Sequence, residues 1–270
     1  MQLTDSKITY IINPLHLAHF ISSSTYVQHY FNLEMISLDK EQLRMKAAQE
    51  AISYIQENTV IGLGGGSTVA CLIRLLHQSG KQVKVVTPSA STTSLCIQYG
   101  LPILPLAYVE RISVAFDGCD EVDARFRALK SGGGIHTREK LVAGMAEHYI
   151  LLVDESRLVE SLTFRHPVVL EILQEALGYV QHSVSLLGGT GTVRTSPAKD
   201  GYTISDNGHL LLDVSFPESD RLDIEGLQDN LKSINGVIET SLFIKEVTGV
   251  IVAGEHGVRT IFRETYGKIN

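Results

Sequence analysis

The sequence predicts an α/β protein: a doubly wound parallel sheet with a second, smaller α+β domain. Three observations support this prediction. Short apolar segments alternate with helical patterns along the first part of the chain, glycine-rich or acidic turns follow several of these segments, and the pattern changes after Pro167. Such alternation is typical of parallel sheets, whose strands need helical crossovers. The 270 residues suffice for one large or two modest domains.

The larger domain is expected to begin with a helix. It runs from Ser37 or Asp39 to about Gln56, because apolar residues recur on one face at helical spacing. The elements expected after it are a strand at 59–63, a helix at 67–77, a strand at 83–87, a capped helix ending at Gly100, a strand at 111–116, a glycine loop and helix over 129–148, and a strand at 149–154.

After Pro167 the sequence predicts a small α+β unit. Its expected elements are a helix over 170–184, a strand at 191–195, a turn at 205–208, a strand at 209–216, a helix near 223–233 and a strand at 236–244. A further strand at 249–254 returns to the first sheet. This split β-α-β pattern assigns 167–243 to the smaller domain, and 37–166 with 244–270 to the larger one.

Residues 1–36 are expected to be an N-terminal extension. They are apolar and aromatic but lack the basic segment of a signal peptide. Met35 directly precedes the first helix start, so the extension is expected either to lie outside the natural chain or to be loosely ordered.

Composition argues against several classes of function. The formal net charge of -7 disfavours a nucleic-acid partner. The sequence contains no run of about 18 apolar residues, the length needed to span a membrane. The three cysteines show no CxxC or metal spacing, which fits reduced thiols in a cytoplasmic protein. No metal site is expected.

The segment GLGGGST, at 62–68, lies between a predicted strand and a predicted helix. Its glycines expose backbone amides, and the helix N-terminus adds the positive end of the helix dipole. Gly66, Ser67 and Thr68 are therefore candidates to bind a phosphate. The segment lacks the third glycine of a dinucleotide fingerprint and the lysine of a P-loop, and a plain glycine turn is the alternative.

Two further loops carry charged side chains. LKSGGGIHTREK, at 129–140, contains Lys130 as a cation and Glu139 as a candidate base, although glutamate often lies there only to favour the helix dipole. DGCDEVD, at 117–123, places four carboxylates in seven positions, where they can act as acid and base, bind Mg²⁺, or form a solvated turn. Each loop follows a predicted strand, so all three can face one crevice. A phosphate loop, a lysine and carboxylates together suit proton transfer on a phosphorylated sugar.

These segments resemble the type A family of ribose-5-phosphate isomerases, of which the chain looks like a divergent member from about residue 39 to its end. The family pattern is G-x-G-T-G-S-T, a DGADE-type motif, a KGGGGA-type loop followed by REK, and V-D-E-S-K. Here these stand as GLGGGST, DGCDEVD, KSGGG…TREK and VDESR, in the same order.

The resemblance implies a Rossmann-like domain with a small α+β domain of ferredoxin-like type. It also implies interconversion of ribose 5-phosphate and ribulose 5-phosphate through an enediolate, in the non-oxidative branch of the pentose phosphate pathway. No metal or organic cofactor is implied, and the only expected partners are a phosphosugar and further copies of the chain in a homodimer or homotetramer.

The resemblance also implies roles for individual residues. Glu139 would be the general base, Asp117 and Asp120 would bind the sugar hydroxyls and assist ring opening, and Lys130 would stabilise the oxyanion. Asp123 is expected to remain a solvated or turn carboxylate. The implied substrate-binding residues are Gly65, Gly66, Ser67, Thr68, Gly118, Ser131, Gly132, Gly133, Arg157 and Arg44.

Four of these positions depart from the family pattern. Gly65 replaces a threonine, Ser131 a glycine, and Arg157 and Arg44 replace lysines. The departures affect substrate positioning rather than chemistry, so an isomerase of another phosphosugar is one alternative. A non-catalytic sugar-phosphate sensor is another, disfavoured by the complete set of acid, base and lysine.

Overall fold

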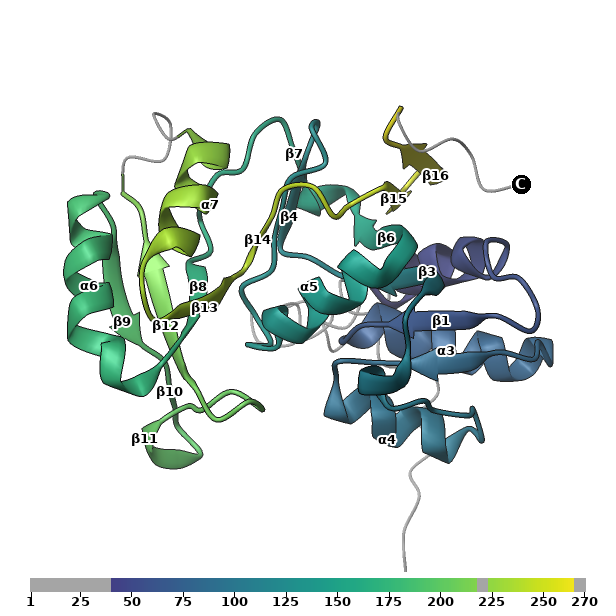
Figure 1. Ribbon diagram of the computed structural model, residues 1–270. Helices are drawn as coiled ribbons and strands as arrows, with labels where there is room; N and C mark the ends of the chain where they lie inside the picture. Colours follow the sequence, from purple (N-terminus) through teal and green to yellow (C-terminus); the bar gives the residue numbers. More distant parts are fainter. Residues whose placement is uncertain (1–39, 218–222, 265–270) are drawn as a thin grey trace, which may run out of the picture. The chain divides into compact units, whose positions relative to one another are not determined.

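The computed structural model describes residues 40–217 and 223–264 (Figure 1). The predicted extension over residues 1–36 lies outside the described residues, as does the predicted start of the first helix. That helix ends at residue 52 rather than near Gln56. Residues 43–270 form one compact unit, which contains everything discussed below.

The larger sheet is parallel except at one edge. Within the described residues its order is β16-β15-β6-β3-β1-β2. The parallel strands are β1 (Val60–Leu63), β2 (Lys84–Val86), β3 (Ile112–Asp117), β6 (Ala146–Asp154) and β15 (Gly249–Gly254), and β16 (Gly257–Phe262) is antiparallel to β15. The predicted parallel sheet is confirmed. Strand β16 was not predicted.

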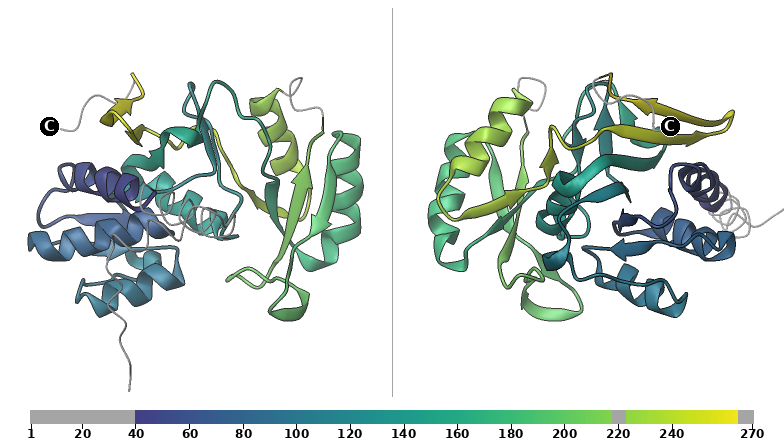
Figure 2. Two further views of the ribbon diagram at one scale, coloured as in Figure 1. Left: turned by 180° about the vertical axis from the view of Figure 1, so that it is seen from behind. Right: turned by 45° about the vertical axis from the view of Figure 1, so that its right-hand side comes forward.

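Helices cover both faces of this sheet. The helix ending at residue 52, α3 (Ser67–Ser79) and α4 (Ala90–Gln98) pack on the face formed by Ile61, Phe116 and Ile150. On the opposite face, α5 (His136–Met145) packs its Val142 and Ala143 against a second core. Successive residues of a strand point to opposite faces of the sheet. Alternate residues of these strands contribute to the two apolar cores, so the sheet is buried on both faces. The arrangement is therefore doubly wound (Figures 1 and 2).

A short mixed sheet forms beyond the carboxyl end of β3. In the part of the chain that the structure describes, its order is β14-β5-β4-β7, from β4 (Glu121–Asp123), β5 (Ala128–Leu129), β7 (Leu158–Val159) and β14 (Leu242–Phe243). The backbone N–H of Asp120 donates to the Leu129 carbonyl over 2.9 Å. This pairing places the acidic segment directly beside the lysine-containing loop.

The smaller sheet is antiparallel and has ferredoxin-like connectivity. Its strands β8 (Val168–Ile172), β9 (Thr190–Val193), β12 (Leu210–Ser215) and β13 (Val237–Thr240) lie in the order β13-β8-β12-β9, with α6 (Leu177–Leu186) and α7 (Ile224–Ser233) as crossovers. This is the β-α-β-β-α-β pattern, and the predicted fold class is confirmed. The hairpin of β10 (Thr195–Ser196) and β11 (Lys199–Tyr202), and three single helical turns, η2 (Leu106–Tyr108), η3 (Glu155–Arg157) and η4 (Gln174–Ala176), complete the described elements.

Two further predicted helices are wrong at one end. The segment expected to be helical over 170–184 begins as strand β8, and its helix starts only at Leu177. All five residues of β8 are buried, so the strand lacks the alternation that would distinguish it from a helix. The helix expected to reach residue 148 ends at Met145, where β6 begins. The domain boundaries at 166/167 and 243/244 stay a prediction.

Among the described residues, no helix has both the length and the apolar character needed to cross a lipid bilayer.

Candidate functional site

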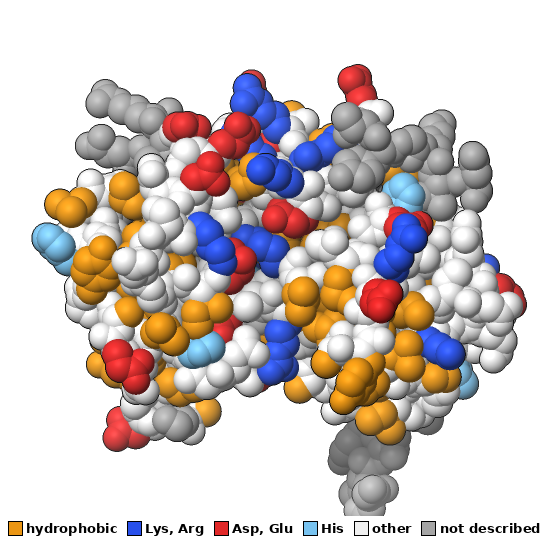
Figure 3. Space-filling model, in the orientation of Figure 1, with side chains coloured by type: hydrophobic (Ala, Val, Ile, Leu, Met, Phe, Trp, Pro, Cys, Tyr) orange, Lys and Arg blue, Asp and Glu red, His pale blue; other side chains and the backbone are white. Residues whose placement is uncertain are grey.

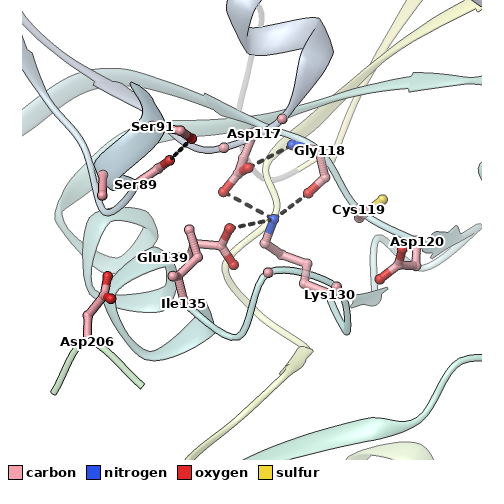
Figure 4. A pocket seen from close by; sticks show the side chains of 15 residues that line it. Ser89, Ser91, Asp117, Gly118, Cys119, Asp120, Lys130, Ile135, Glu139 and Asp206 are labelled. Carbon is pink, nitrogen blue, oxygen red and sulfur yellow. Dashed lines mark hydrogen bonds and ion pairs between the residues drawn. The ribbon is translucent and has the colours of Figure 1, made fainter. Parts of the chain in front are cut away.

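A cavity of about 490 Å³ lies at the carboxyl ends of β1 and β3 (Figure 4). All three loops that the sequence analysis singled out contribute to its wall, as expected for loops that follow neighbouring parallel strands. The predicted residues that line it are Gly65, Gly66, Asp117, Gly118, Asp120, Lys130, Gly132, Gly133 and Glu139, and the unpredicted ones are Ser89, Ala90, Ser91, Cys119, Ile135 and Asp206.

Lys130 lies between two carboxylates in the wall of this cavity. Its Nζ is 3.1 Å from Asp117 Oδ2 and 3.4 Å from Glu139 Oε1, and it also donates to the carbonyl oxygen of Gly118. All three side chains are at least nine-tenths buried. Figure 4 shows the ammonium group at the centre of these contacts. The single ammonium group of Lys130 is therefore shared by two buried carboxylates from different segments of the chain.

Asp117, at the end of β3, is held in one orientation. The N–H of Gly118 donates to its Oδ1 over 2.8 Å, and the hydroxyl of Tyr149 donates to its Oδ2 over 2.9 Å. Gly64 is needed beside it, because a Cβ at that position would fall on the Asp117 carboxyl group. The glycine of the first loop thus makes room for the acid of the second.

Burial and like charge raise the proton affinity of Glu139. Desolvation raises its pKa to about 8, the negative charge of Asp117 adds to the rise, and the attraction of Lys130 opposes it. For Lys130, burial favours the neutral amine, but the charges of Asp117 and Glu139 outweigh this and raise its pKa. The cluster therefore combines a permanent ammonium with a carboxyl group that titrates near neutral pH.

Cys119 lines the same cavity but packs its side chain against the core of the α5 face. Burial raises the pKa of its thiol to about 12. A protonated thiol is a poor nucleophile, so the geometry gives this cysteine no catalytic role.

Asp120 lines the cavity and is fixed by the neighbouring loops. Its Oδ2 accepts a 2.6 Å hydrogen bond from the Ser131 N–H. Its Oδ1 is 3.4 Å from Nη1 of Arg157, which also donates to the Asp120 carbonyl over 3.2 Å. Ser131 and Arg157 do not line the cavity themselves, so in this structure both act on the site through Asp120.

The other two acids of the segment point elsewhere and have partners of their own. Glu121 is buried and accepts hydrogen bonds from the N–H and hydroxyl of Thr163. Asp123 is buried and paired with Arg127, whose Nη2 is 2.6 Å from Oδ2. Asp123 is therefore not solvated, but it is a turn carboxylate, as the expectation allowed: its Oδ1 accepts hydrogen bonds from the N–H groups of Arg125 over 2.9 Å and Arg127 over 3.0 Å. The cationic Arg127 four residues later was the sequence signal for this pair.

The first glycine loop leads into α3. Gly66 caps this helix at a φ of 98°, a conformation that disfavours other residues, and has no side chain to occupy the helix N-terminus. Gly65 and Gly66 line the cavity, whereas Ser67 and Thr68 lie in the first turn of α3 outside the cavity wall. Of the three residues predicted to bind a phosphate, the structure thus brings only Gly66, the N-cap of α3, to the cavity wall.

A second helix N-terminus meets the same end of the cavity. Ser89 caps α4 by accepting the Thr92 N–H over 3.2 Å, and its Oγ lies 2.9 Å from that of Ser91. Both serines line the cavity (Figure 4). The sequence analysis predicted a capped helix here but not its place in the site. Its signal was the polar segment PSAST directly after a strand.

The second glycine loop is held from outside by the smaller sheet. Arg194 donates from Nη1 to the Gly132 carbonyl over 3.0 Å and from Nη2 to the Ser131 carbonyl over 2.8 Å, and it is itself paired with Asp213 at 2.6 Å. These bonds fix the loop carbonyls away from the cavity wall formed by Gly132 and Gly133.

Asp206 reaches the cavity from the turn before β12, which buried Glu171 of β8 holds in place. The Glu171 carboxylate accepts hydrogen bonds from Thr137 in the first turn of α5 and from three residues of the turn: Ser205, Asn207 and His209. Arg138 also contacts the turn, donating to the Asp206 carbonyl over 3.0 Å. The helix that carries Glu139 is therefore tied to the smaller sheet.

Arg44 is half-buried in the first described helix and is not part of the cavity wall. Of the predicted substrate-binding residues, the structure thus brings five to the cavity, namely Gly65, Gly66, Gly118, Gly132 and Gly133. Within residues 40–217 and 223–264, no group of three or more His, Cys, Asp or Glu side chains is placed to hold a metal ion.

Comparison with known proteins gives one consistent result. The family described as Ribose 5-phosphate isomerase A (phosphoriboisomerase A) matches residues 84–257. Ribose-5-phosphate isomerase A of Sinorhizobium fredii is 37% identical over 232 residues, covering 83% of this chain and 99% of that protein.

Two solved structures are similar throughout. Ribose 5-phosphate isomerase A of Methanocaldococcus jannaschii is 35% identical, with a TM-score of 0.77 and coverage of 83% of this chain and 99% of that one. A D-ribose-5-phosphate isomerase in complex with phospho-erythronic acid is also 35% identical, with a TM-score of 0.78 and the same coverage.

Proposed function

The chain belongs to the ribose 5-phosphate isomerase A family, and we propose that it interconverts ribose 5-phosphate and ribulose 5-phosphate through an enediolate. The observation that carries the proposal is the buried cluster in which Lys130 pairs with both Asp117 and Glu139 in the wall of one cavity. The complex of a related isomerase with phospho-erythronic acid supports it. An enediolate carries its two oxygens on two adjacent planar carbons, and a carboxylate likewise presents two oxygens in one plane.

Glu139 is assigned as the base. Isomerisation moves one proton between C2 and C1 of the open-chain sugar. The Glu139 carboxylate removes the proton from C2 of the aldose and returns it to C1 of the enediolate, so the enzyme is unchanged at the end of the cycle. A base is most effective when its pKa lies near the working pH, and Glu139, at about 8, meets this condition.

Lys130 and the two aspartates handle the oxygens. Negative charge develops on the carbonyl oxygen as the C2 proton leaves, and a fixed ammonium group in a buried site stabilises it strongly. Asp117 and Asp120 are assigned to the sugar hydroxyls, where a carboxylate can accept the hydroxyl proton that must move between O2 and O1 and assist ring opening. The proposed steps use no metal or organic cofactor.

The phosphate is assigned to the end of the cavity where α3 and α4 begin. Gly65 and Gly66 offer backbone groups there, Ser67 and Thr68 lie in the adjoining turn of α3, and two helix N-termini favour an anion. Ser89 and Ser91 can add hydroxyl donors, which compensates for the hydroxyl missing at Gly65. Arg157 is assigned a supporting role through Asp120, whereas Arg44, which lies outside the cavity wall, stays a prediction from the family resemblance.

The test is an isomerisation assay on a panel of phosphosugars, including ribose 5-phosphate, arabinose 5-phosphate and a hexose 6-phosphate. We expect the highest kcat/KM on ribose 5-phosphate. A higher value on another sugar would show that Gly65, Ser131 and Arg157 have changed the substrate, and binding without turnover of any sugar would favour the sensor alternative.

We also propose that the protein acts in the cytoplasm as a homodimer or homotetramer, without a nucleic-acid partner. The net charge of -7 supports the last point. The face shown in Figure 3 likewise carries acidic and basic side chains close together rather than one continuous basic patch. Light scattering of the purified protein would test the assembly.

A further inference from the structure

Tyr149 is a buried polar residue that the mechanism above leaves unused. It lies on β6, pairs in register with Ala115 of β3, and stands two residues before the partner of Asp117, which is Leu151. Paired residues of parallel strands point to the same face, so the tyrosine side chain and Asp117 lie on one side of the sheet. The small Ala115 leaves room for the ring, whose hydroxyl reaches Asp117 Oδ2 at 2.9 Å.

The ring itself cannot easily move. Tyr149 is 1% exposed, and it stacks on Phe243 with ring centroids 6.0 Å apart and an interplanar angle of 11°. Phe243 also lies under the ammonium group of Lys130, at 5.7 Å from the ring centroid. Phe243 therefore both packs against the tyrosine ring and lies beneath the cation.

We propose that Tyr149 is a positioning residue of the isomerase site: its hydroxyl donates to Asp117 and holds it in one orientation, so that the proton shared by the two acids is held on Glu139. The inference rests on the proposed function for its catalytic meaning. Its geometric basis, a buried phenol donating to one buried carboxylate of a coupled pair, does not depend on that function.

Each charged group around Asp117 has a part in this arrangement. Lys130, from the loop after β5, contacts both acids, whereas Glu139, from α5, competes with Asp117 for the proton. Cys119 and Asp120, from the loop after β3, lie close by, and Arg157 pairs with Asp120. The single positive charge of Lys130 can neutralise one of the two negative charges. The neutral hydroxyl of Tyr149, which donates only to Asp117, therefore influences which of the two acids is the charged one.

The tyrosine remains a donor throughout the working range. Burial raises the pKa of its hydroxyl well above the usual value, and the charge of Asp117 raises it further. The ionised phenolate is therefore not reached, and the hydroxyl acts only through its hydrogen bond.

Tyr149→Phe is the decisive variant, since it removes one oxygen and keeps the buried ring. Without the hydroxyl, the singly protonated pair can hold its proton on Asp117. When the pair then loses its proton, the carboxylate of Asp117 no longer has the tyrosine hydroxyl as a hydrogen-bond donor, so the doubly ionised pair is less stable than in the wild type. We expect the acidic limb of kcat/KM to move to higher pH by about one unit, in line with the usual strength of a hydrogen bond to a charged group, while KM at high pH changes less than about threefold.

Tyr54→Phe is a matched control. Tyr54 is a partly buried tyrosine outside the site, whose hydroxyl donates to the Glu50 carboxylate over 3.3 Å. It should leave the pH profile of the isomerase unchanged.

A second readout needs no substrate. The melting temperature of Tyr149→Phe should fall further below that of the wild type as the pH rises from 6 to 9. The reason is that loss of the hydrogen bond destabilises the pair of Asp117 and Glu139 most when both acids are ionised. The Tyr54→Phe difference should stay constant over this range.

The outcomes separate the two proposals. If the wild type isomerises none of the phosphosugars, the proposed function fails, and the melting temperatures still test the hydrogen bond. If the wild type is active but Tyr149→Phe shows an unmoved acidic limb and a pH-independent change in melting temperature, the inference about Tyr149 is overturned and the proposed function stands.

Discussion

At the scale of single residues, the site depends on where one proton is held. Asp117 and Glu139 are both buried and share the single ammonium group of Lys130. Desolvation penalises ionisation of either acid, and the charge of one penalises ionisation of the other. A carboxyl group with a pKa near 8 is the result, and such a group can take up and return a carbon-bound proton near neutral pH.

Replacement of this base should stop turnover without unfolding the protein. Glu139→Gln keeps the size of the side chain but cannot accept the C2 proton. We expect kcat to fall by about 10²–10⁴-fold, the usual contribution of a positioned acid–base group. Binding of phospho-erythronic acid, measured by calorimetry, should change little. A variant with nearly wild-type kcat would refute the assignment.

The same substitution should stabilise the folded protein at alkaline pH. The pKa of Glu139 is raised on folding, so between its usual value of 4.5 and about 8 the folded state binds more protons than the unfolded state. Stability from this group therefore falls as the pH rises through that window. The melting temperature of Glu139→Gln relative to the wild type should increase from pH 5 to pH 9. A difference that stays flat or shrinks over this range would contradict the raised pKa.

Two adjacent glycines should respond in opposite ways to substitution. A Cβ at Gly65 would make only ordinary contacts, with Ser89 Oγ at 3.6 Å and Ile135 Cδ1 at 3.7 Å. Gly65→Thr should therefore fold normally and should change KM for ribose 5-phosphate by no more than about tenfold, with a decrease expected if the hydroxyl reaches the phosphate. Gly64→Ala should displace Asp117 and lower kcat strongly. Steady-state kinetics of both variants checks the pair, and loss of activity in a folded Gly65→Thr protein would show a reshaped loop.

At the scale of elements, the sequence predicts most of the larger sheet because each apolar strand is followed by a glycine-rich, polar or acidic turn that marks its end. β1, β2 and β3 and the helices after them lie where apolar runs, caps and glycines indicate. β8 was read as a helix because buried strands show no alternation, and length and flanking residues are then the only guides. The two- and three-residue strands β4, β5 and β7 gave no periodic signal, and the strand predicted at 236–244 is divided into β13 and β14.

The site was predictable to a similar extent, and for a related reason. Motifs on one loop, such as the segment around Asp117, can be read directly from the sequence. Ser89 and Asp206 reach the cavity only through tertiary packing. The partner of Asp123 was within reach of sequence reasoning, since Arg127 lies four residues away, whereas the hydroxyl of Tyr149 could be connected to Asp117 only through the strand register.

The link between β8 and α5 gives a prediction at this scale. Glu171 is fully buried and accepts hydrogen bonds from four side chains, so Glu171→Gln leaves an amide facing donors that it cannot satisfy. We expect a loss of about 2–4 kcal/mol in stability, measured by urea unfolding. Because hydrogen bonds from Thr137 and its other donors lower the pKa of Glu171 against the opposing effect of burial, the wild type should lose this stabilisation as the pH falls below about 4.5. A variant as stable as the wild type at neutral pH would show that the carboxylate charge is not needed.

At the scale of the whole molecule, the site is assembled from the loops of one sheet and held by residues of another. Arg194 fixes the carbonyls of Ser131 and Gly132. The backbone N–H of Lys130 donates to the Ser241 carbonyl over 3.1 Å, and the Ser241 N–H donates to Val169 of β8 over 2.8 Å. The loop of Lys130 is therefore held by contacts from both sheets.

This arrangement has a consequence for amide hydrogen exchange. Proteins open in cooperative segments, and each amide exchanges with the segment on which its hydrogen bond depends. The amide of Lys130, which donates to Ser241, should therefore exchange at the rate of β8 and β13, not at the slower or faster rate of β3, although β3 carries Asp117. The amide of Ser131, which donates to Asp120, should instead exchange with the segment that follows β3. Mass spectrometry of deuterated peptides can separate the two groups. Loosening of the smaller sheet by Arg194→Ala should then speed exchange at residue 130 while β1 and β3 keep their protection, so that the isomerase would lose its lysine loop before its parallel sheet opens.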